Sequence, residues 1–245
     1  MSVHWHSYPD ARGAAEAAAR YILVQLDNAL AGKEYATLAI SGGSTPKLLF
    51  EELVKTRYRW DHVHLFWVDE RAVPPTHPQS NFKLAEEFLI APAHFPRRNV
   101  HRIPAELTPE RAAEHYVQDI RRFFELEEGE LPHFDIVQQG IGPDAHTASL
   151  FPGEPLIDDR EGIAAAVYAE NQAQWRITLL PGVLLKARHT VFLASGEDKM
   201  EAVRAVIQDE YDPKRLPAQV VSHHGRGVSW FLDDAASLLL RVQRA

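Results

Sequence analysis

Short apolar runs alternate with segments of helical character along the whole chain. The runs have the length and composition of strands, and they are Tyr35–Ile40, Val63–Val68, Asn99–Ile103, Phe134–Val137, Ala164–Tyr168, Arg176–Leu180, His189–Ala194 and Val228–Leu232. A further segment, Val3–Tyr8, alternates weakly and is expected to be an edge strand. Between them, helix propensity or helical spacing of apolar residues predicts helices at Ala11–Leu30, Lys47–Val54, Ser80–Leu89, Thr108–Leu126, Val183–Arg188, Asp198–Ile207 and Asp233–Val242. Such alternation is typical of an α/β fold, a doubly wound, mainly parallel sheet flanked by helices in a Rossmann-like three-layer arrangement. The segment Pro217–Val221 has no clear pattern.

No internal repeat, low-complexity tract or flexible linker interrupts this pattern, so residues 1–245 are predicted to form a single domain. The net charge of −8 argues against a nucleic-acid partner, because such binding needs Lys and Arg to neutralise phosphates. It does not exclude a local basic pocket for a small anion. The absence of cysteine excludes a disulfide framework, a zinc–thiolate site and a thiol nucleophile. No signal peptide or bilayer-length apolar stretch is visible, so we expect a cytoplasmic protein with no membrane partner.

A loop of small and hydroxyl residues joins the strand Tyr35–Ile40 to the helix that follows it. Pro46 suits the first helical position, and the free N–H groups and dipole of a helix start attract anions. The glycines permit close backbone approach, and three hydroxyls can donate to phosphate oxygens. Helix capping alone would need fewer such residues. The loop is therefore predicted to bind phosphate through Ser41, Gly42, Gly43, Ser44 and Thr45.

Charged residues follow two further strands at the point where each strand ends. Asp69, Glu70 and Arg71 come directly after Val63–Val68. Considered alone, these residues would be interpreted as the solvent-exposed end of a strand with a salt bridge that contributes little to stability. In open α/β sheets, ligands bind outside the carboxyl ends of the strands. These three residues are expected at that edge, level with the phosphate loop. A role in the same pocket is therefore favoured. Lys199, near a helix start after the strand His189–Ala194, can face this ligand or lie on the surface.

An acid and a histidine, Asp144 and His146, lie two residues apart just past the strand Phe134–Val137. Two glycines and a proline break regular structure between the strand and this pair. The pair can be catalytic or can bind a ligand; alternatively, the acid caps a turn and the histidine is incidental. The phosphate loop and the charged strand end are expected at the same sheet edge, and this favours the catalytic interpretation.

Together, six stretches resemble the 6-phosphogluconolactonase family, within the wider superfamily of glucosamine-6-phosphate isomerases and 6-phosphogluconolactonases. They occur in the family's order over nearly the whole chain, and they are Ser41–Pro46, Trp67–Arg71, His77–Asn81, Gly140–Pro152, Arg176–Thr178 and Ser195–Lys199. Each stretch is weak alone, but six in order are specific. The resemblance implies hydrolysis of 6-phospho-D-glucono-1,5-lactone to 6-phospho-D-gluconate in the oxidative pentose phosphate pathway. It implies a small-molecule sugar-phosphate substrate, no cofactor and no metal, and we expect a monomer or weak homodimer.

By match to the family's motifs, the Ser41–Thr45 loop, Arg176 and Lys199 would hold the sugar phosphate. His146 would be the general base, and Arg71 would face the lactone carbonyl. The chemistry agrees, because histidine's ordinary pKa suits a base near neutral pH and a fixed cation stabilises an oxyanion. Asp69 or Asp144 can orient the base or the sugar hydroxyls, and we assign positioning to Asp144.

The sequence departs from the family's usual pattern at a few positions. Ala145 stands where glycine is usual, so either its φ is negative or backbone strain is tolerated. Gln138 and Gln139 replace apolar residues, and Pro181-Gly182 and Leu185 also differ. These departures put the geometry of the loops in question more than the activity.

Two alternatives remain. An amino-sugar phosphate isomerase of the same superfamily would carry Glu near Phe151 and Tyr at Arg71. A non-catalytic sugar-phosphate sensor would keep the phosphate loop but would lack the base at His146.

Overall fold

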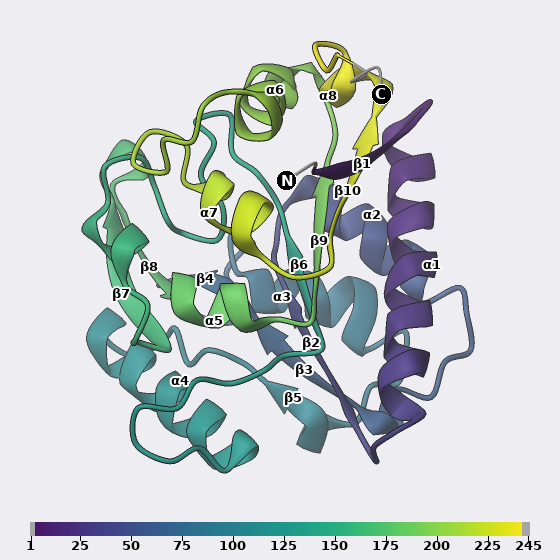
Figure 1. Ribbon diagram of the computed structural model, residues 1–245. Coiled ribbons are helices and arrows are strands. Elements are labelled where there is room, and N and C mark those ends of the chain that lie inside the picture. The colour runs from purple at the N-terminus through teal and green to yellow at the C-terminus, as the bar shows by residue number, and fades with distance from the viewer. Residues whose placement is uncertain (1–2, 242–245) are drawn as a thin grey trace.

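A seven-stranded parallel sheet forms the centre of the computed structural model, which describes residues 3–241 (Figure 1). Every strand pair in it is parallel. The strand order is β1-β10-β9-β6-β2-β3-β5, which confirms the doubly wound fold. The strands are β1 His4–Tyr8, β2 Ala36–Ile40, β3 Val63–Trp67, β5 Val100–His101, β6 Ile136–Gln139, β9 His189–Ala194 and β10 Val228–Asp233.

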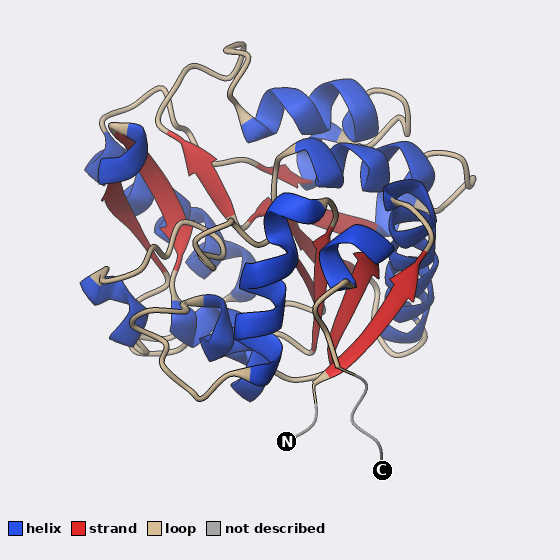
Figure 2. Ribbon diagram, turned by 90° about the horizontal axis from the view of Figure 1, so that it is seen from above, coloured by secondary structure: helices blue, strands red, loops and turns tan. Residues whose placement is uncertain are grey.

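Helices cover both faces of this sheet, as the buried and largely apolar central strands require. Figure 1 shows α1 and α2 on one face and α5 and α7 on the other. The view from above shows the same layering (Figure 2). In the described part of the chain, no helix is both long and apolar enough to cross a membrane. The helices are α1 Ala11–Leu30, α2 Ser44–Leu53, α3 Asn81–Ala85, α4 Pro109–Phe124, α5 Pro181–Lys186, α6 Met200–Gln208, α7 Ala218–His224 and α8 Asp234–Ser237.

The longest helix, α1, illustrates how local sequence determines an element. The Asp10 side chain accepts a hydrogen bond from the backbone N–H of Gly13 at 2.8 Å and so caps the helix start. Fully buried residues then recur every fourth position, which places one apolar stripe against the sheet. They are Ala14, Ala18, Ile22 and Leu26.

Several boundaries differ from the sequence predictions. Helix α2 begins at Ser44, so Pro46 lies within its first turn rather than at its first position. The helix predicted to reach Val242 is only four residues long and ends at Ser237, and Val242 itself lies outside the described residues. Helix α7 fills the segment that had no clear pattern. The predicted helix Ser80–Leu89 is α3 continued by a π-helical turn, Glu86–Ile90.

The main correction is a second, antiparallel sheet of three strands in the order β4-β8-β7. Its strands are β4 Asp69–Arg71, β7 Ala164–Ala169 and β8 Gln174–Leu179. The three charged residues after β3 thus form a strand of their own, which the sequence did not predict. Val68 joins the two sheets, since its N–H donates to Ile40 O and its carbonyl accepts from Leu179 N–H, both at 2.8 Å. Helix α4 packs against β7 and β8.

Candidate active site

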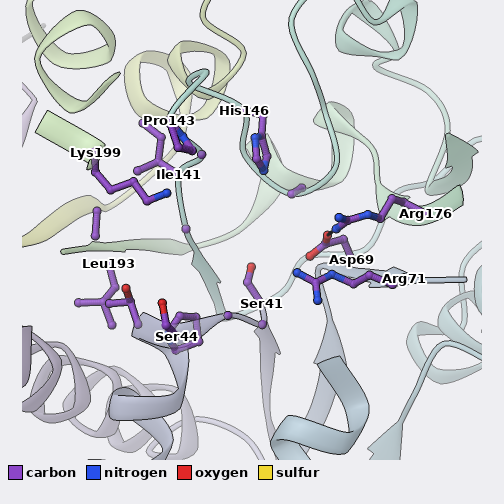
Figure 3. A pocket seen from close by; sticks show the side chains of 18 residues that line it. Ser41, Ser44, Asp69, Arg71, Ile141, Pro143, His146, Arg176, Leu193 and Lys199 are labelled. Carbon is purple, nitrogen blue, oxygen red and sulfur yellow. Dashed lines mark ion pairs between the residues drawn. The ribbon is translucent and has the colours of Figure 1, made fainter. Parts of the chain in front are cut away.

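A cavity of about 190 Å³ opens at the carboxyl edge of the parallel sheet. Its lining comes from the ends of β2, β6 and β9, from the small sheet and from the loops that follow them. Figure 3 shows Lys199 and Ser44 on one side of the cavity, Arg71, Asp69 and Arg176 on the other, and His146 between them. The predicted site residues that line it are Ser41, Gly42, Gly43, Ser44, Thr45, Asp69, Arg71, His146, Arg176 and Lys199. Asp144 lies behind His146 and does not line the cavity.

The segment Ser41–Thr45, which we call the loop wall, leads from β2 into α2. Gly43 is the residue before the helix, has a φ of +123° and provides no side-chain cap. The first N–H groups of α2 therefore have no capping partner, which suits anion binding. Gly42 approaches Asn81 so closely that a Cβ would lie 1.9 Å from its Oδ1 atom. Only glycine fits there.

The three hydroxyls of the loop wall are not equivalent. Ser41 Oγ donates to Gln138 O at 3.1 Å, and Thr45 Oγ1 lies 2.9 Å from Ser195 Oγ. Ser44 is exposed. The loop wall thus offers the hydroxyl of Ser44 more freely than the other two.

The opposite side of the cavity, which we call the sheet wall, consists of Asp69, Arg71 and Arg176. Arg71 and Arg176 are directly opposite each other in the β4–β8 register. Because side chains alternate along a strand, Asp69 shares their face and Glu70 points away. Like charges directly opposite each other repel, and the carboxylate of Asp69, with Oδ2 3.8 Å from Arg176 Nη1, offsets that repulsion.

Burial and neighbouring charges act together on the sheet wall. Arg176 is 5% exposed, and burial lowers the pKa of its guanidinium, with Asp69 acting in the opposite direction and Arg71 lowering it further. Arg71 Nη1 donates to Gln79 O at 2.7 Å, which fixes that guanidinium beside the cavity. The Nε atoms of both arginines are buried and have no hydrogen-bond partner.

Glu70 has a structural role. Its carboxylate accepts hydrogen bonds from the N–H groups of Arg71, Asn81 and Phe82 at 2.7–2.8 Å, and from Ser80 Oγ at 3.1 Å. Burial raises the pKa of Glu70, and the three backbone donors oppose that shift. Glu70 therefore caps α3, and it does not line the cavity.

His146 and Asp144 form a hydrogen-bonded pair, with His146 Nδ1 2.5 Å from Asp144 Oδ1. Burial alone would raise the pKa of Asp144, but the hydrogen bonds and charge of His146 outweigh it, and the pKa is lowered. An ionised carboxylate can only accept, so Nδ1 carries the proton and Nε2 is free to act as a base.

The backbone around this pair is tight. Ala145 has a φ of +64°, so the strained alternative left open by the sequence is the one observed. A Cβ at Gly142 would lie 2.0 Å from His146 Nδ1, so glycine is required beneath the ring. On another side, the Phe151 ring is 4.7 Å from the His146 ring. Sequence reasoning did not identify Gly142, Phe151 or Asn81 as residues that shape the site.

The two glutamines in the unusual strand end are fully buried and anchor both loops. Gln138 Oε1 accepts from Ser41 N–H at 3.0 Å, and Thr147 Oγ1 lies 2.6 Å from Gln139 Oε1. They therefore connect β6 to the loop wall and to the loop that carries His146. Among residues 3–241, no group of three His, Asp or Glu side chains is arranged to hold a metal ion.

Fold and site together define an α/β protein with a cation-lined cavity at the carboxyl edge of its sheet, beside a His–Asp pair. Residues 9–230 match the family described as glucosamine-6-phosphate isomerases/6-phosphogluconolactonase, and the chain belongs to this family. The sequence is 35% identical over 221 residues to a 6-phosphogluconolactonase of Synechocystis sp., covering 90% of this chain and 91% of that protein. It is 36% identical to a human 6-phosphogluconolactonase, covering 84% and 81% of the two chains.

Solved structures agree with this membership. The 6-phosphogluconolactonase from Trypanosoma brucei superposes with a TM-score of 0.88 at 25% identity, over 98% of this chain and 100% of that one. A monomeric glucosamine-6-phosphate deaminase superposes with a TM-score of 0.81 at 18% identity, over 97% and 100% of the two chains. That second similarity concerns the fold alone.

Proposed function

We propose that this chain hydrolyses 6-phospho-D-glucono-1,5-lactone to 6-phospho-D-gluconate in the oxidative pentose phosphate pathway. The observation that carries the proposal is the His146–Asp144 pair, whose histidine faces a cavity with cations on two sides. Relatives that cover most of the chain at 35–36% identity are named 6-phosphogluconolactonases, which supports the same reaction here.

The charge of the cavity suits a sugar phosphate. Three cationic side chains and one carboxylate line it, a balance of +2, whereas the chain as a whole carries −8. A phosphate group carries close to two negative charges at neutral pH. We assign the phosphate to the loop wall together with Arg176 and Lys199, and we assign to Asp69 the acceptance of a hydrogen bond from a sugar hydroxyl.

In the proposed mechanism, His146 Nε2 takes a proton from water as the water oxygen bonds to the lactone carbonyl carbon. The carbonyl oxygen becomes an oxyanion, which Arg71 stabilises. The intermediate collapses by breaking the bond between that carbon and the ring oxygen, and His146 returns the proton to the ring oxygen. Asp144 holds the Nδ1 proton and stabilises the imidazolium between the two transfers.

The deaminase alternative has less support from the site. Arg71 and Phe151 stand where the resemblance would place Tyr and Glu, and Phe151 packs on the His146 ring rather than offering a second carboxylate. A sensor would need no base, and the hydrogen bond between His146 and Asp144, which suits a general base, argues against a sensor. Incubation with glucosamine 6-phosphate, followed by an ammonia assay, separates the deaminase from the lactonase.

The direct test compares wild type with His146→Asn on 6-phosphogluconolactone, after subtraction of spontaneous hydrolysis. We expect the variant to lose about 10²- to 10⁴-fold in kcat, the usual contribution of a general base. Binding of 6-phosphogluconate, measured by calorimetry, should change little because the loop wall, Arg176 and Lys199 are intact. A variant that keeps the wild-type kcat would refute the assignment of the base.

We also propose that residues 1–245 act as one domain, as a monomer or weak homodimer, in the cytoplasm. One hydrophobic core extends across both sheets, which supports the single domain.

Charged sugar phosphates do not cross membranes unaided, so the enzyme must work where its substrate is made. Light scattering on the purified protein and cell fractionation test the last two points.

A further inference from the structure

Ser149 is a fully buried serine that connects the loop carrying His146 to the sheet wall. Its Oγ donates to Asp69 Oδ2 at 2.7 Å, and its backbone N–H donates to Thr178 Oγ1 at 3.1 Å. Ser149 does not line the cavity, so it can act on a ligand only through Asp69. The backbone contact to Thr178 does not depend on the hydroxyl and would keep the loop in place without it.

The ion pair next to this hydroxyl is unusually open. Asp69 and Arg176 are each 5% exposed, yet Asp69 Oδ2 and Arg176 Nη1 are 3.8 Å apart. Arginine and carboxylate normally close to 2.7–2.9 Å when they pair. The oxygen that faces Arg176 is the one that accepts from Ser149. The hydroxyl thus satisfies the carboxylate in a position where it does not hydrogen-bond to the guanidinium.

We propose that Ser149 is a positioning residue that holds Asp69 away from Arg176 and so keeps the charge of Arg176 available to the substrate phosphate. The inference rests on the proposed function, in which Arg176 binds that phosphate. Without the hydroxyl, the buried carboxylate loses a charge-assisted hydrogen bond. The nearest charged donor is Nη1 of Arg176, so Asp69 moves into hydrogen-bond contact with this guanidinium. The carboxylate then competes with the substrate phosphate for Arg176.

The test is Ser149→Ala, with kcat and KM for 6-phosphogluconolactone and the Kd for 6-phosphogluconate measured by calorimetry. We expect KM and Kd to rise about 10- to 100-fold, the usual effect of losing one hydrogen bond to a charged group. The value of kcat should stay within about 2-fold, because His146 and Arg71 are untouched. Ser149→Thr restores a hydroxyl and should restore most of the affinity.

A double-mutant cycle distinguishes positioning from a general structural role. In an Arg176→Gln background the competing guanidinium is gone, so Ser149→Ala should no longer change the Kd for 6-phosphogluconate. The matched control is Ser222→Ala, which removes another buried hydroxyl, one that accepts from Trp230 Nε1 at 3.1 Å. It should lower the melting temperature without changing KM.

An unchanged KM and Kd in Ser149→Ala would overturn the inference, and so would an equal effect of this substitution with and without Arg176. Neither result would contradict the proposed function, provided that the wild-type protein hydrolyses the lactone. Conversely, a wild type without lactonase activity would refute the proposed function. The binding cycle with 6-phosphogluconate would then still decide whether Ser149 keeps Arg176 available.

Discussion

The two walls of the cavity are built in different ways. The loop wall is one contiguous segment, Ser41–Thr45, which follows β2 and starts α2. The sheet wall assembles Asp69 and Arg71 from β4 with Arg176 from β8, two strands that are distant in the sequence. The loop wall presents backbone N–H groups, and its glycines let the backbone come close to neighbouring atoms. The sheet wall presents charged side chains whose positions are fixed by an antiparallel register.

Because of this difference, the two walls should be sensitive to different kinds of substitution. The loop wall depends on glycines that no other residue can replace, so its weakness is steric. The sheet wall depends on a balance of one carboxylate against two guanidiniums, so its weakness is electrostatic. The walls meet where Gly42 contacts Asn81, whose Nδ2 donates to Asp69 O at 2.9 Å.

Among substitutions in the two walls, the largest effect is expected at the arginines of the sheet wall, where the two variants should differ in kind. Arg71→Gln should lower kcat about 10²- to 10³-fold, as for loss of one oxyanion donor, with a small change in KM. Arg176→Gln should mainly raise KM, because its proposed partner is the phosphate, which does not react. Steady-state kinetics on 6-phosphogluconolactone measures both. If the two variants showed the same pattern, the division of roles within the sheet wall would be wrong.

The next effect tests the contact between the walls. Gly42→Ala forces a methyl against the buried Asn81 side chain and should cost about 1–3 kcal/mol of stability, the usual result of overpacking. It should also raise KM, because Asn81 holds the Asp69 backbone. Thermal unfolding and kinetics are the measurements. Gly32→Ala is the matched control, since a Cβ there meets nothing within 4 Å; equal losses in both variants would contradict the steric explanation.

The smallest effect concerns the other end of β3, away from both walls. His64 Nδ1 lies 3.0 Å from His101 Nε2, and burial, followed by the charges of His101 and Arg98, lowers the pKa of His64 to about 4. Between pH 6.5 and 4 the unfolded chain therefore binds a proton that the folded chain does not. Stability should therefore decrease as the pH is lowered through that range. The loss at pH 5 should be about 1 kcal/mol, because solvent screens a half-buried imidazole.

The measurement is denaturant unfolding between pH 4 and 7. His64→Gln keeps a hydrogen-bonding group but should flatten this pH dependence, whereas the exposed His115→Gln should not. Neither substitution should change lactonase kcat at neutral pH, since neither residue lines the cavity. A profile in His64→Gln as steep as that of wild type would assign the effect to other groups.

Much of the fold could be predicted because its signals are local. Apolar runs such as His189–Ala194 are strands throughout their predicted length, and α1 has the predicted bounds. Two strands of the small sheet, β7 and β8, coincide with predicted apolar runs. Its third strand, β4, and the antiparallel pairing could not be predicted, because β4 is three charged residues whose pairing with β8 depends on a segment distant in the sequence. The length of helix α8 also differs from the prediction. Its Ala- and Leu-rich sequence favours a longer helix, but α8 ends at Ser237.

The sequence by itself determined which residues gather at the carboxyl edge, since strand ends in a parallel sheet are level and their loops carry the polar groups. Those residues include His146, Arg71 and Lys199, and all three line the cavity. The tertiary structure alone decided how they are oriented. It placed Asp144 behind His146, forced Ala145 to a φ of +64°, turned Glu70 away to cap α3, and set Asp69 between Ser149 and Arg176. These outcomes depend on register and close contacts between distant segments, which no local pattern records.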